Sequence, residues 1–260
     1  MSNISPSKKI ERNKNIFYKE RMAGGFSHVD STIEFYTRLN SLLDPEMKVL
    51  DFGAGRGAQL IEVSSNYVFN LIKLKGKVKF LVGVDIDPAV MENPFLDEAR
   101  IIDYSSMIEF DDGYFDLIFA DWVLEHVDNP KEFEENIYRL LKPGGWFCAR
   151  TPNRWGITGL ATNLIPNRFH KLILRYLQPN RKEIDVFPTT YKLNTKMRLN
   201  RFFNRDRWNN FSYISNSEPP YVSRSKALMI LVFLYWRIVP SFFYTNFFVF
   251  LRKKDQDPIC

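Results

Sequence analysis

The sequence has few of the residues that build disulfide frameworks or metal clusters. It contains two cysteines, Cys148 and Cys260, and three histidines among 260 residues. The two cysteines form no metal-binding spacing and no disulfide pattern, so we expect a reducing compartment, the cytoplasm, and no metal. The first fifteen residues are polar and basic and lack an apolar segment, so we expect no secretory signal there.

Long apolar runs are also scarce. Residues 227–250 carry one charge, Arg237, and their length alone would allow a membrane span. Arg237 and Pro240 interrupt this stretch, and its longest uninterrupted run, Ala227–Trp236, has ten residues. A run of that length is typical of a buried helix. We therefore expect a core helix over 223–239, and peripheral contact of this helix with a membrane stays open.

Acidic residues are nearly missing from residues 150–210. This segment has a local net charge of +10, which leaves about −4 for the rest of a chain whose net charge is +6. Such a segment favours an anionic partner (phosphate, nucleic acid or a lipid surface), unless it is only a solvated face. Its 13 cations are Arg150, Arg154, Arg168, Lys171, Arg175, Arg181, Lys182, Lys192, Lys196, Arg198, Arg201, Arg205 and Arg207.

A glycine-rich stretch is the most informative local pattern. The run Val49-Leu50-Asp51-Phe52 ends in Gly53-Ala54-Gly55-Arg56-Gly57. An apolar run followed by alternate glycines predicts a buried strand, a tight turn and a helix beginning near Ala58. Glycine tolerates positive φ and lets a ligand approach the backbone, so the turn is expected to hold a cofactor.

Strand and helix patterns alternate along the chain, which predicts a mostly parallel sheet with helices on both faces. A first helix is expected between Ser31-Thr32, as its cap, and Asp44-Pro45. Later helices are expected at 58–74, after Asp87-Pro88, after Asn129-Pro130 and at 223–239. A sharp turn is expected at 142–145. Strands are expected at 48–52, 79–85, 99–102, 115–120, 146–150, 211–214 and 245–251.

Three acids follow or end the first three strands: Asp51, Asp85 and Asp103. In open α/β sheets ligands bind at the carboxyl ends of strands. A ligand with an amino acid at one end and adenosine at the other would use all three acids, for its ammonium, its ribose and its adenine. The glycine spacing by itself leaves NAD open, because Ala58 is accepted in the last place of the dinucleotide pattern.

In order and content, these motifs resemble class I S-adenosylmethionine-dependent methyltransferases of the ubiquinone-biosynthesis-like methyltransferase domain family. The matching residues are Val49 to Gly57, Gly83-Val84-Asp85, Asp103, Phe115 to Ala120, Leu124-Glu125-His126-Val127 and Leu140 to Gly145. The resemblance implies a Rossmann-like, doubly wound, seven-stranded α/β sheet, mostly parallel, with an antiparallel last strand and a basic cap insertion.

The resemblance also implies the cofactor, S-adenosyl-L-methionine, and its contacts. Gly53 and Gly55 would line the methionine part, Asp85 would bind ribose, and Asp103 with Tyr104 would flank adenine. The full set of predicted cofactor residues is Asp51, Gly53, Ala54, Gly55, Gly57, Asp85, Ile86, Asp103, Tyr104, Ala120 and Asp121.

The expected domain organisation places the cap between two parts of the sheet. The predicted segments are a flexible N-terminus (1–15), a cofactor-binding core (16–151), a basic substrate cap (152–209), a strand-helix-strand completion of the sheet (210–254) and a tail (255–260).

The acceptor is less well defined than the donor. His126 is a candidate general base or a packing histidine. The sequence after the fourth strand, Ala120-Asp121-Trp122-Val123, lacks an Asn/Asp-Pro-Pro-aromatic motif, which disfavours DNA or protein-glutamine methylation. We expect a small-molecule, sugar-linked or lipid-linked acceptor, with an anionic group in keeping with the basic cap. One alternative is an RNA acceptor stacking on Phe202, Phe203 and Trp208, and the other is a non-catalytic donor-binding module.

Overall fold

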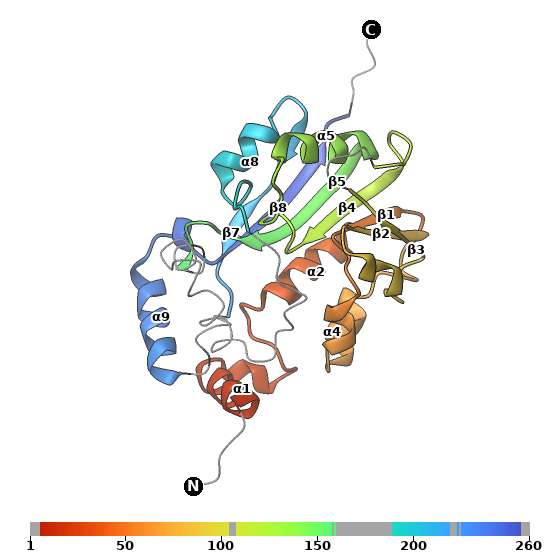
Figure 1. Ribbon diagram of the computed structural model, residues 1–260. Coiled ribbons are helices and arrows are strands. Elements are labelled where there is room, and N and C mark those ends of the chain that lie inside the picture. Colours follow the sequence, from red (N-terminus) through yellow and green to blue (C-terminus); the bar gives the residue numbers. More distant parts are fainter. Residues whose placement is uncertain are drawn as a thin grey trace. The chain divides into compact units, whose positions relative to one another are not determined.

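Strands and helices alternate over most of the chain (Figure 1). The computed structural model describes residues 6–103, 108–157, 159, 189–218, 223 and 225–255. The helices, with 3-10 turns marked η, are α1 (Pro6–Phe17), η1 (Lys19–Met22), α2 (Ser31–Ser41), α3 (Ala58–Glu62), α4 (Asn66–Ile72), η2 (Pro88–Glu92), α5 (Pro130–Leu140), α8 (Lys196–Phe202), α9 (Lys226–Ile238) and η4 (Ser241–Phe243). The strands are β1 (Lys48–Phe52), β2 (Phe80–Asp85), β3 (Glu98–Ile101), β4 (Phe115–Asp121), β5 (Leu141–Pro152), β6 (Trp208–Asn210), β7 (Tyr213–Ser215) and β8 (Asn246–Lys253).

One sheet of eight strands organises the structure. Its order is β3-β2-β1-β4-β5-β8-β6, and β7 also pairs with β8. The neighbouring strands from β3 to β5 in this order pair in parallel. Strands β6 and β8 pair with each other in antiparallel orientation. The predicted Rossmann-like, mostly parallel sheet is therefore confirmed. Within the described residues it has eight strands, one more than predicted, because the chain around the predicted strand 211–214 forms two three-residue strands, β6 and β7.

Side chains alternate between the two faces of the sheet, as the two-residue strand period requires. On one face, Val49, Leu117 and Phe119 join a core cluster with Phe35 and Leu39 of α2. On the other face, Phe52 meets Phe133 of α5 edge-on at 5.1 Å, and Phe147 stacks on Phe203 near α8 at 5.6 Å. Cys148, in β5, is fully buried in the first cluster.

The predicted helix 58–74 is broken into α3 and α4. Val63 is extended, with ψ at 130°, and Ser65 caps α4 by accepting a hydrogen bond from the backbone N–H of Val68. A serine at this position competes with a continuous helix because its hydroxyl can bond the backbone locally. The prediction of one helix was wrong for this reason.

Other differences are local. The predicted turn 142–145 lies inside β5, where Gly144 has a φ of 74° and the β4–β5 register shifts after Phe115. The side chain of Asp30, and not Ser31-Thr32, caps α2, because its Oδ1 accepts from the N–H groups of Thr32 and Ile33. Helix α1 covers most of the predicted flexible N-terminus.

The chain divides into two compact units. The sheet unit contains residues 35–152, 189–213 and 247–260, and the α1–α9 unit contains 1–34, 153–188 and 214–246. In the α1–α9 unit, Phe17 stacks on Phe233 at 5.3 Å and the side-chain amide of Asn13 donates to the carbonyl of Ser223. The predicted domain boundaries stay a prediction. Among the described residues, no helix has both the length and the apolarity needed to cross a membrane.

Candidate functional site

The glycine-rich turn follows β1 at the carboxyl edge of the sheet. The backbone N–H groups of Gly53 and Ala54 both donate to the carbonyl of Val84, at 2.8 and 3.1 Å. These bonds fix the turn to β2. Gly53, Gly55 and Gly57 have φ values of 79°, 49° and 74°, in the left-handed region that favours glycine.

The three glycines differ in what surrounds them. A Cβ on Gly53 would lie 2.4 Å from Cγ2 of Val123, and one on Gly57 would lie 2.7 Å from Oδ1 of Asn93. A Cβ on Gly55 would meet nothing nearer than Oδ2 of Asp85, at 3.9 Å. Gly53 and Gly57 are therefore needed for packing, whereas Gly55 leaves open space in front of the turn.

Asp85 ends β2 directly beside this open space. Its Oδ2 accepts the backbone N–H of Gly55 and its Oδ1 accepts the backbone N–H of Asp87, both at 2.9 Å. The residue is buried. An ionised carboxylate has about four acceptor positions, so the two backbone bonds orient the group and leave acceptor positions for a ligand with two hydroxyls.

Asn93 holds the turn from the other side, and sequence reasoning missed it. Its Nδ2 donates to the carbonyls of Gly55 and Ala54, at 3.0 and 3.3 Å, and its Oδ1 accepts the N–H of Phe95. No local pattern identifies this role, because Asn93 lies 36 residues beyond Gly57 in a segment with no recognisable motif.

A buried ion pair lies at the carboxyl end of β4. Arg150 donates to both carboxylate oxygens of Asp121, at 2.8 and 2.7 Å, and the two residues are direct partners in the β4–β5 register. The hydroxyl of Tyr36 lies 3.2 Å from Asp121 Oδ2 and 3.4 Å from Gln59 Oε1. Burial, with the charges of Asp121 and Asp85, raises the pKa of Asp51 well above its ordinary value. Asp51, Asp85 and Asp121 therefore lie near one another, whereas the predicted set of strand-end acids was Asp51, Asp85 and Asp103.

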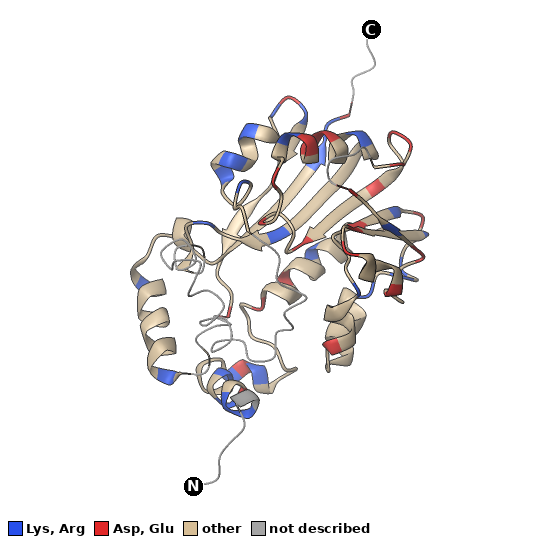
Figure 2. Ribbon diagram, viewed as in Figure 1, with Lys and Arg blue, Asp and Glu red and all other residues tan. Residues whose placement is uncertain are grey.

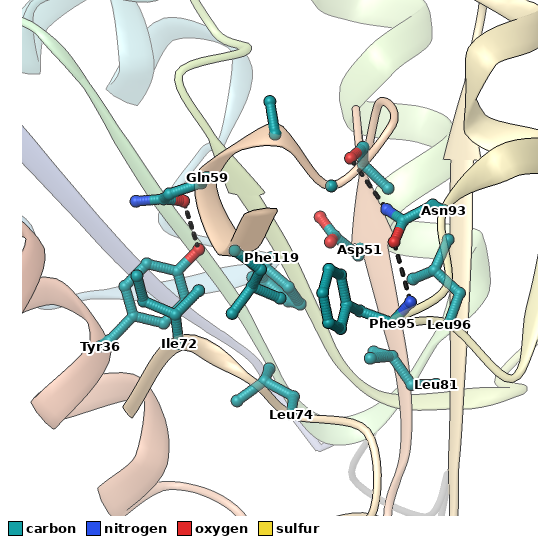
Figure 3. Close-up of a pocket in the computed structure, with 14 residues that line it drawn as sticks. Tyr36, Asp51, Gln59, Ile72, Leu74, Leu81, Asn93, Phe95, Leu96 and Phe119 are labelled. Atoms are coloured by element: carbon teal, nitrogen blue, oxygen red, sulfur yellow. Dashed lines mark hydrogen bonds between the residues drawn. The ribbon is translucent and has the colours of Figure 1, made fainter. Parts of the chain in front are cut away.

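A small cavity lies behind the turn (Figure 3). Its volume is about 80 Å³, and Asp51, Ala54 and Gly57 line it together with Tyr36 and Phe119. Sites for cofactors usually measure about 300–1,000 Å³. This cavity is too small for a nucleoside cofactor, and it does not include Asp85 in its lining.

A second cluster of buried polar side chains connects the end of β5 with Glu125, in the loop after β4. The side chain of Asn194 donates to Thr151 Oγ1 at 2.5 Å and to the carbonyl of Pro152 at 3.0 Å. The Pro152 carbonyl can only accept, so the orientation of the Asn194 amide is fixed. The Thr151 hydroxyl accepts from Asn194 and therefore donates its proton to Glu125 Oε2, at 2.7 Å. Burial raises the pKa of Glu125 to about 7.

The other predicted site residues are placed as follows. Ala120 is buried in β4, and Ile86 is exposed directly after β2. Asp103 is exposed two residues after Ile101, which pairs with Asp85. Tyr104 lies outside the described residues. His126 is half-buried in the loop between β4 and α5, where its backbone N–H donates to Val123. The cofactor and base roles stay predictions.

Part of the basic segment is neutralised by acids of the sheet unit. Besides the Arg150–Asp121 pair, Arg207 pairs with Glu134 at 3.2 Å and Lys192 pairs with Asp128 at 2.5 Å. Figure 2 shows the remaining Lys and Arg most clearly along α8. Summing charge along the sequence therefore overstates the positive charge of the described part of this segment, which leaves out 158 and 160–188.

Two of the aromatic side chains that the RNA alternative requires are in the core. Phe203 and Trp208 are each 1% exposed, and Trp208 Nε1 donates to Glu134 Oε1 at 2.7 Å. They are not accessible for stacking on bases. Phe202, the third, is half-buried.

One comparison with known proteins shows the family of the chain. A family model described as "Methyltransferase domain" matches residues 24–209. No curated protein matches the chain. A chain from the complex between the Haloferax volcanii Trm112 methyltransferase activator and a proposed methyltransferase is 13% identical, with a TM-score of 0.55 over 96% of each chain.

Two further solved structures have a similar fold. A proposed S-adenosylmethionine-dependent methyltransferase from Listeria monocytogenes is 13% identical, with a TM-score of 0.52 over 85% of this chain and 98% of that one. An S-adenosylmethionine-dependent methyltransferase from Mesorhizobium loti is 12% identical, with a TM-score of 0.50 over 83% and 96%. At these identities the similarity shows the fold.

Proposed function

Because the chain belongs to the methyltransferase domain family, we propose that it transfers a methyl group from S-adenosylmethionine to a small-molecule, sugar-linked or lipid-linked acceptor. The observation that carries the cofactor assignment is the oriented Asp85 carboxylate beside the open face of Gly55. S-adenosylmethionine supplies a methyl group activated by its sulfonium centre.

The residues at this edge of the sheet fit that cofactor. Asp85 has acceptor positions left for the two ribose hydroxyls, and Gly55 leaves room for a ligand close to the backbone. Asp51 would support the ammonium group. Its raised pKa favours the neutral acid in the free protein, so a bound cation would favour its ionisation.

The contribution of the chain to the reaction is mainly alignment and exclusion of water. The Arg150–Asp121 pair and Tyr36 fix the end of β4, next to the predicted methionine end. A proton must be removed only when the acceptor is a hydroxyl or a carbon acid. His126 is the residue we propose for that case.

Calorimetric titration with S-adenosylmethionine tests the cofactor site. We expect Asp85→Ala to lower affinity about 100-fold, because two hydrogen bonds to a charged group contribute about 1.5 kcal/mol or more each. Asp85→Asn should also bind weakly, because both oxygens of Asp85 accept backbone N–H groups and an amide NH₂ cannot. Asp111→Asn, in an exposed turn, is the control. Wild-type affinity in Asp85→Ala would contradict the assignment.

The acceptor class requires a separate experiment. The protein is incubated with methyl-labelled donor and cell extract, and the label is followed into lipid-soluble, water-soluble, protein and RNA fractions. We expect the label in the lipid-soluble or the small-molecule fraction. Label in RNA would favour the RNA alternative. Donor binding without formation of S-adenosylhomocysteine from any fraction would favour the non-catalytic alternative.

A further inference from the structure

Helix α9 exposes a continuous apolar stripe. Ile230, Leu231, Leu234 and Ile238 are 49%, 60%, 54% and 83% exposed. At 3.6 residues per turn these four positions fall within about 100° of the helix circumference. The exposed ring of Phe242, in η4, follows the helix along the chain. Scattered exposed apolar residues are ordinary, but a stripe of this kind marks an interaction surface.

The opposite face of α9 fixes the helix in its own unit. Met229 and Val232 are buried, and Phe233 packs against Phe17 and Tyr18 at ring distances of 5.3 and 5.4 Å. The side chain of Ser225 caps the first turn by accepting from the N–H of Leu228. Contacts on the opposite face therefore fix the position of α9, and the exposed stripe is not needed to hold the helix in place.

Charge indicates what the stripe contacts. Lys226 and Arg237 lie at the two ends of α9 but close together around its circumference, next to Ile230 at one edge of the stripe. No Asp or Glu occurs anywhere between residues 225 and 254. Helix α1, which packs on α9, carries the exposed cations Lys9 and Arg12 in the same unit, together with exposed Glu11, which pairs with Arg21. Within α9 both charged residues beside the stripe are cations, and an apolar stripe flanked by cations complements an anionic lipid surface.

The length of α9 fixes the geometry of that contact. Its 13 residues span about 20 Å, whereas the hydrocarbon core of a bilayer is about 30 Å thick. We propose that α9 and Phe242 form an interfacial element that lies in the plane of an anionic bilayer, with the stripe of Ile230, Leu231, Leu234 and Ile238 inserted among the lipids. This proposal is independent of the methyl-transfer proposal.

Vesicle co-sedimentation of the full chain tests the proposal. We expect binding to phosphatidylcholine vesicles that contain phosphatidylglycerol, and at least tenfold weaker binding to pure phosphatidylcholine. Leu231→Ser/Ile238→Ser should lower binding to the mixed vesicles about 100-fold, because two of the most exposed apolar groups of the stripe are removed. The matched control, Met22→Ser/Met197→Ser, removes two side chains that are each 78% exposed elsewhere and should bind as wild type.

A second pair of variants separates charge from apolar contact. Lys226→Gln/Arg237→Gln should remove most of the preference for phosphatidylglycerol, whereas Lys131→Gln/Lys196→Gln, on α5 and α8, should preserve it. Circular dichroism verifies that each variant is folded. Wild-type vesicle binding by Leu231→Ser/Ile238→Ser would overturn the proposal. So would a concentration-dependent dimer that this variant abolishes without lipid, since the stripe would then be a face between two copies of the chain.

Discussion

At the scale of single residues, the direction of each hydrogen bond limits what can replace a side chain. Asp85 accepts two backbone N–H groups, Asn93 donates to the glycine turn, and Asn194 fixes the proton of Thr151. The sequence predicted the acids but not Asn93, Asn194 or Arg150. The acids end strands, which is a local pattern, whereas the other three residues act through contacts between distant parts of the chain.

Substitution of Gly55 should affect ligand binding more than folding. In Gly55→Ala the new Cβ would make an ordinary contact, 3.9 Å from Oδ2 of Asp85, and the positive φ costs about 1–2 kcal/mol. We expect a folded protein whose affinity for S-adenosylmethionine falls at least tenfold. Gly53→Ala should lose more stability, because its Cβ would lie 2.4 Å from Val123. Urea denaturation and calorimetry measure the two effects, and full donor affinity in Gly55→Ala would refute the role of the open space.

Glu125 should make stability depend on pH. Burial raises its pKa from 4.5 to about 7 in the folded state, so between these values the folded chain holds a proton that the unfolded chain releases. Stability therefore falls as pH rises through this window, by about 3 kcal/mol in total. Glu125→Gln should remove this fall. Urea denaturation at pH 5 and pH 8 measures it, and an equal pH dependence in the variant would exclude Glu125 as its source.

At the scale of elements, strands with both an apolar run and a clear end were predicted well. The predicted bounds of β1 are confirmed, and those of β2 and β4 differ by one residue. The break between α3 and α4 was missed because Ser65 is one of several polar residues that could also lie on the exposed face of a continuous helix. Strands β6 and β7 were merged because three-residue strands depend on their partner, β8, more than on their own sequence.

The hydrogen bond from Trp208, in β6, to Glu134, in α5, should contribute to the free energy of unfolding. Trp208 Nε1 donates to buried Glu134, which also pairs with Arg207. Trp208→Phe keeps an aromatic ring but removes this donor, so we expect a loss of about 1–3 kcal/mol in the free energy of unfolding. The effect should shrink in a Glu134→Gln background, as a double-mutant cycle would show. Additive losses would mean that the two side chains do not interact.

At the scale of the whole molecule, the ordered set of strand-end motifs was sufficient to predict the family, and the methyltransferase domain match confirms it. Local charge was a poorer guide. Arg150 and Arg207 were counted with the basic segment 150–210, yet they neutralise Asp121 and Glu134 inside the sheet unit. Which cation meets which acid is decided by strand register and helix packing, so a sum along the sequence does not contain it.

The rate at which a reagent labels the fully buried thiol of Cys148 can measure how often the sheet opens. Burial raises the pKa of this thiol. A thiol reagent therefore meets the reactive thiolate of Cys148 only when the sheet opens. In a Cys260→Ser background, the labelling rate therefore reports how often β5 becomes accessible. Saturating S-adenosylmethionine, at about 100 times its dissociation constant, should slow labelling about 100-fold where opening releases the ligand. Unchanged labelling would separate donor binding from the opening of β5. The labelling rate of Cys148 can therefore report binding of the cofactor before any acceptor is known.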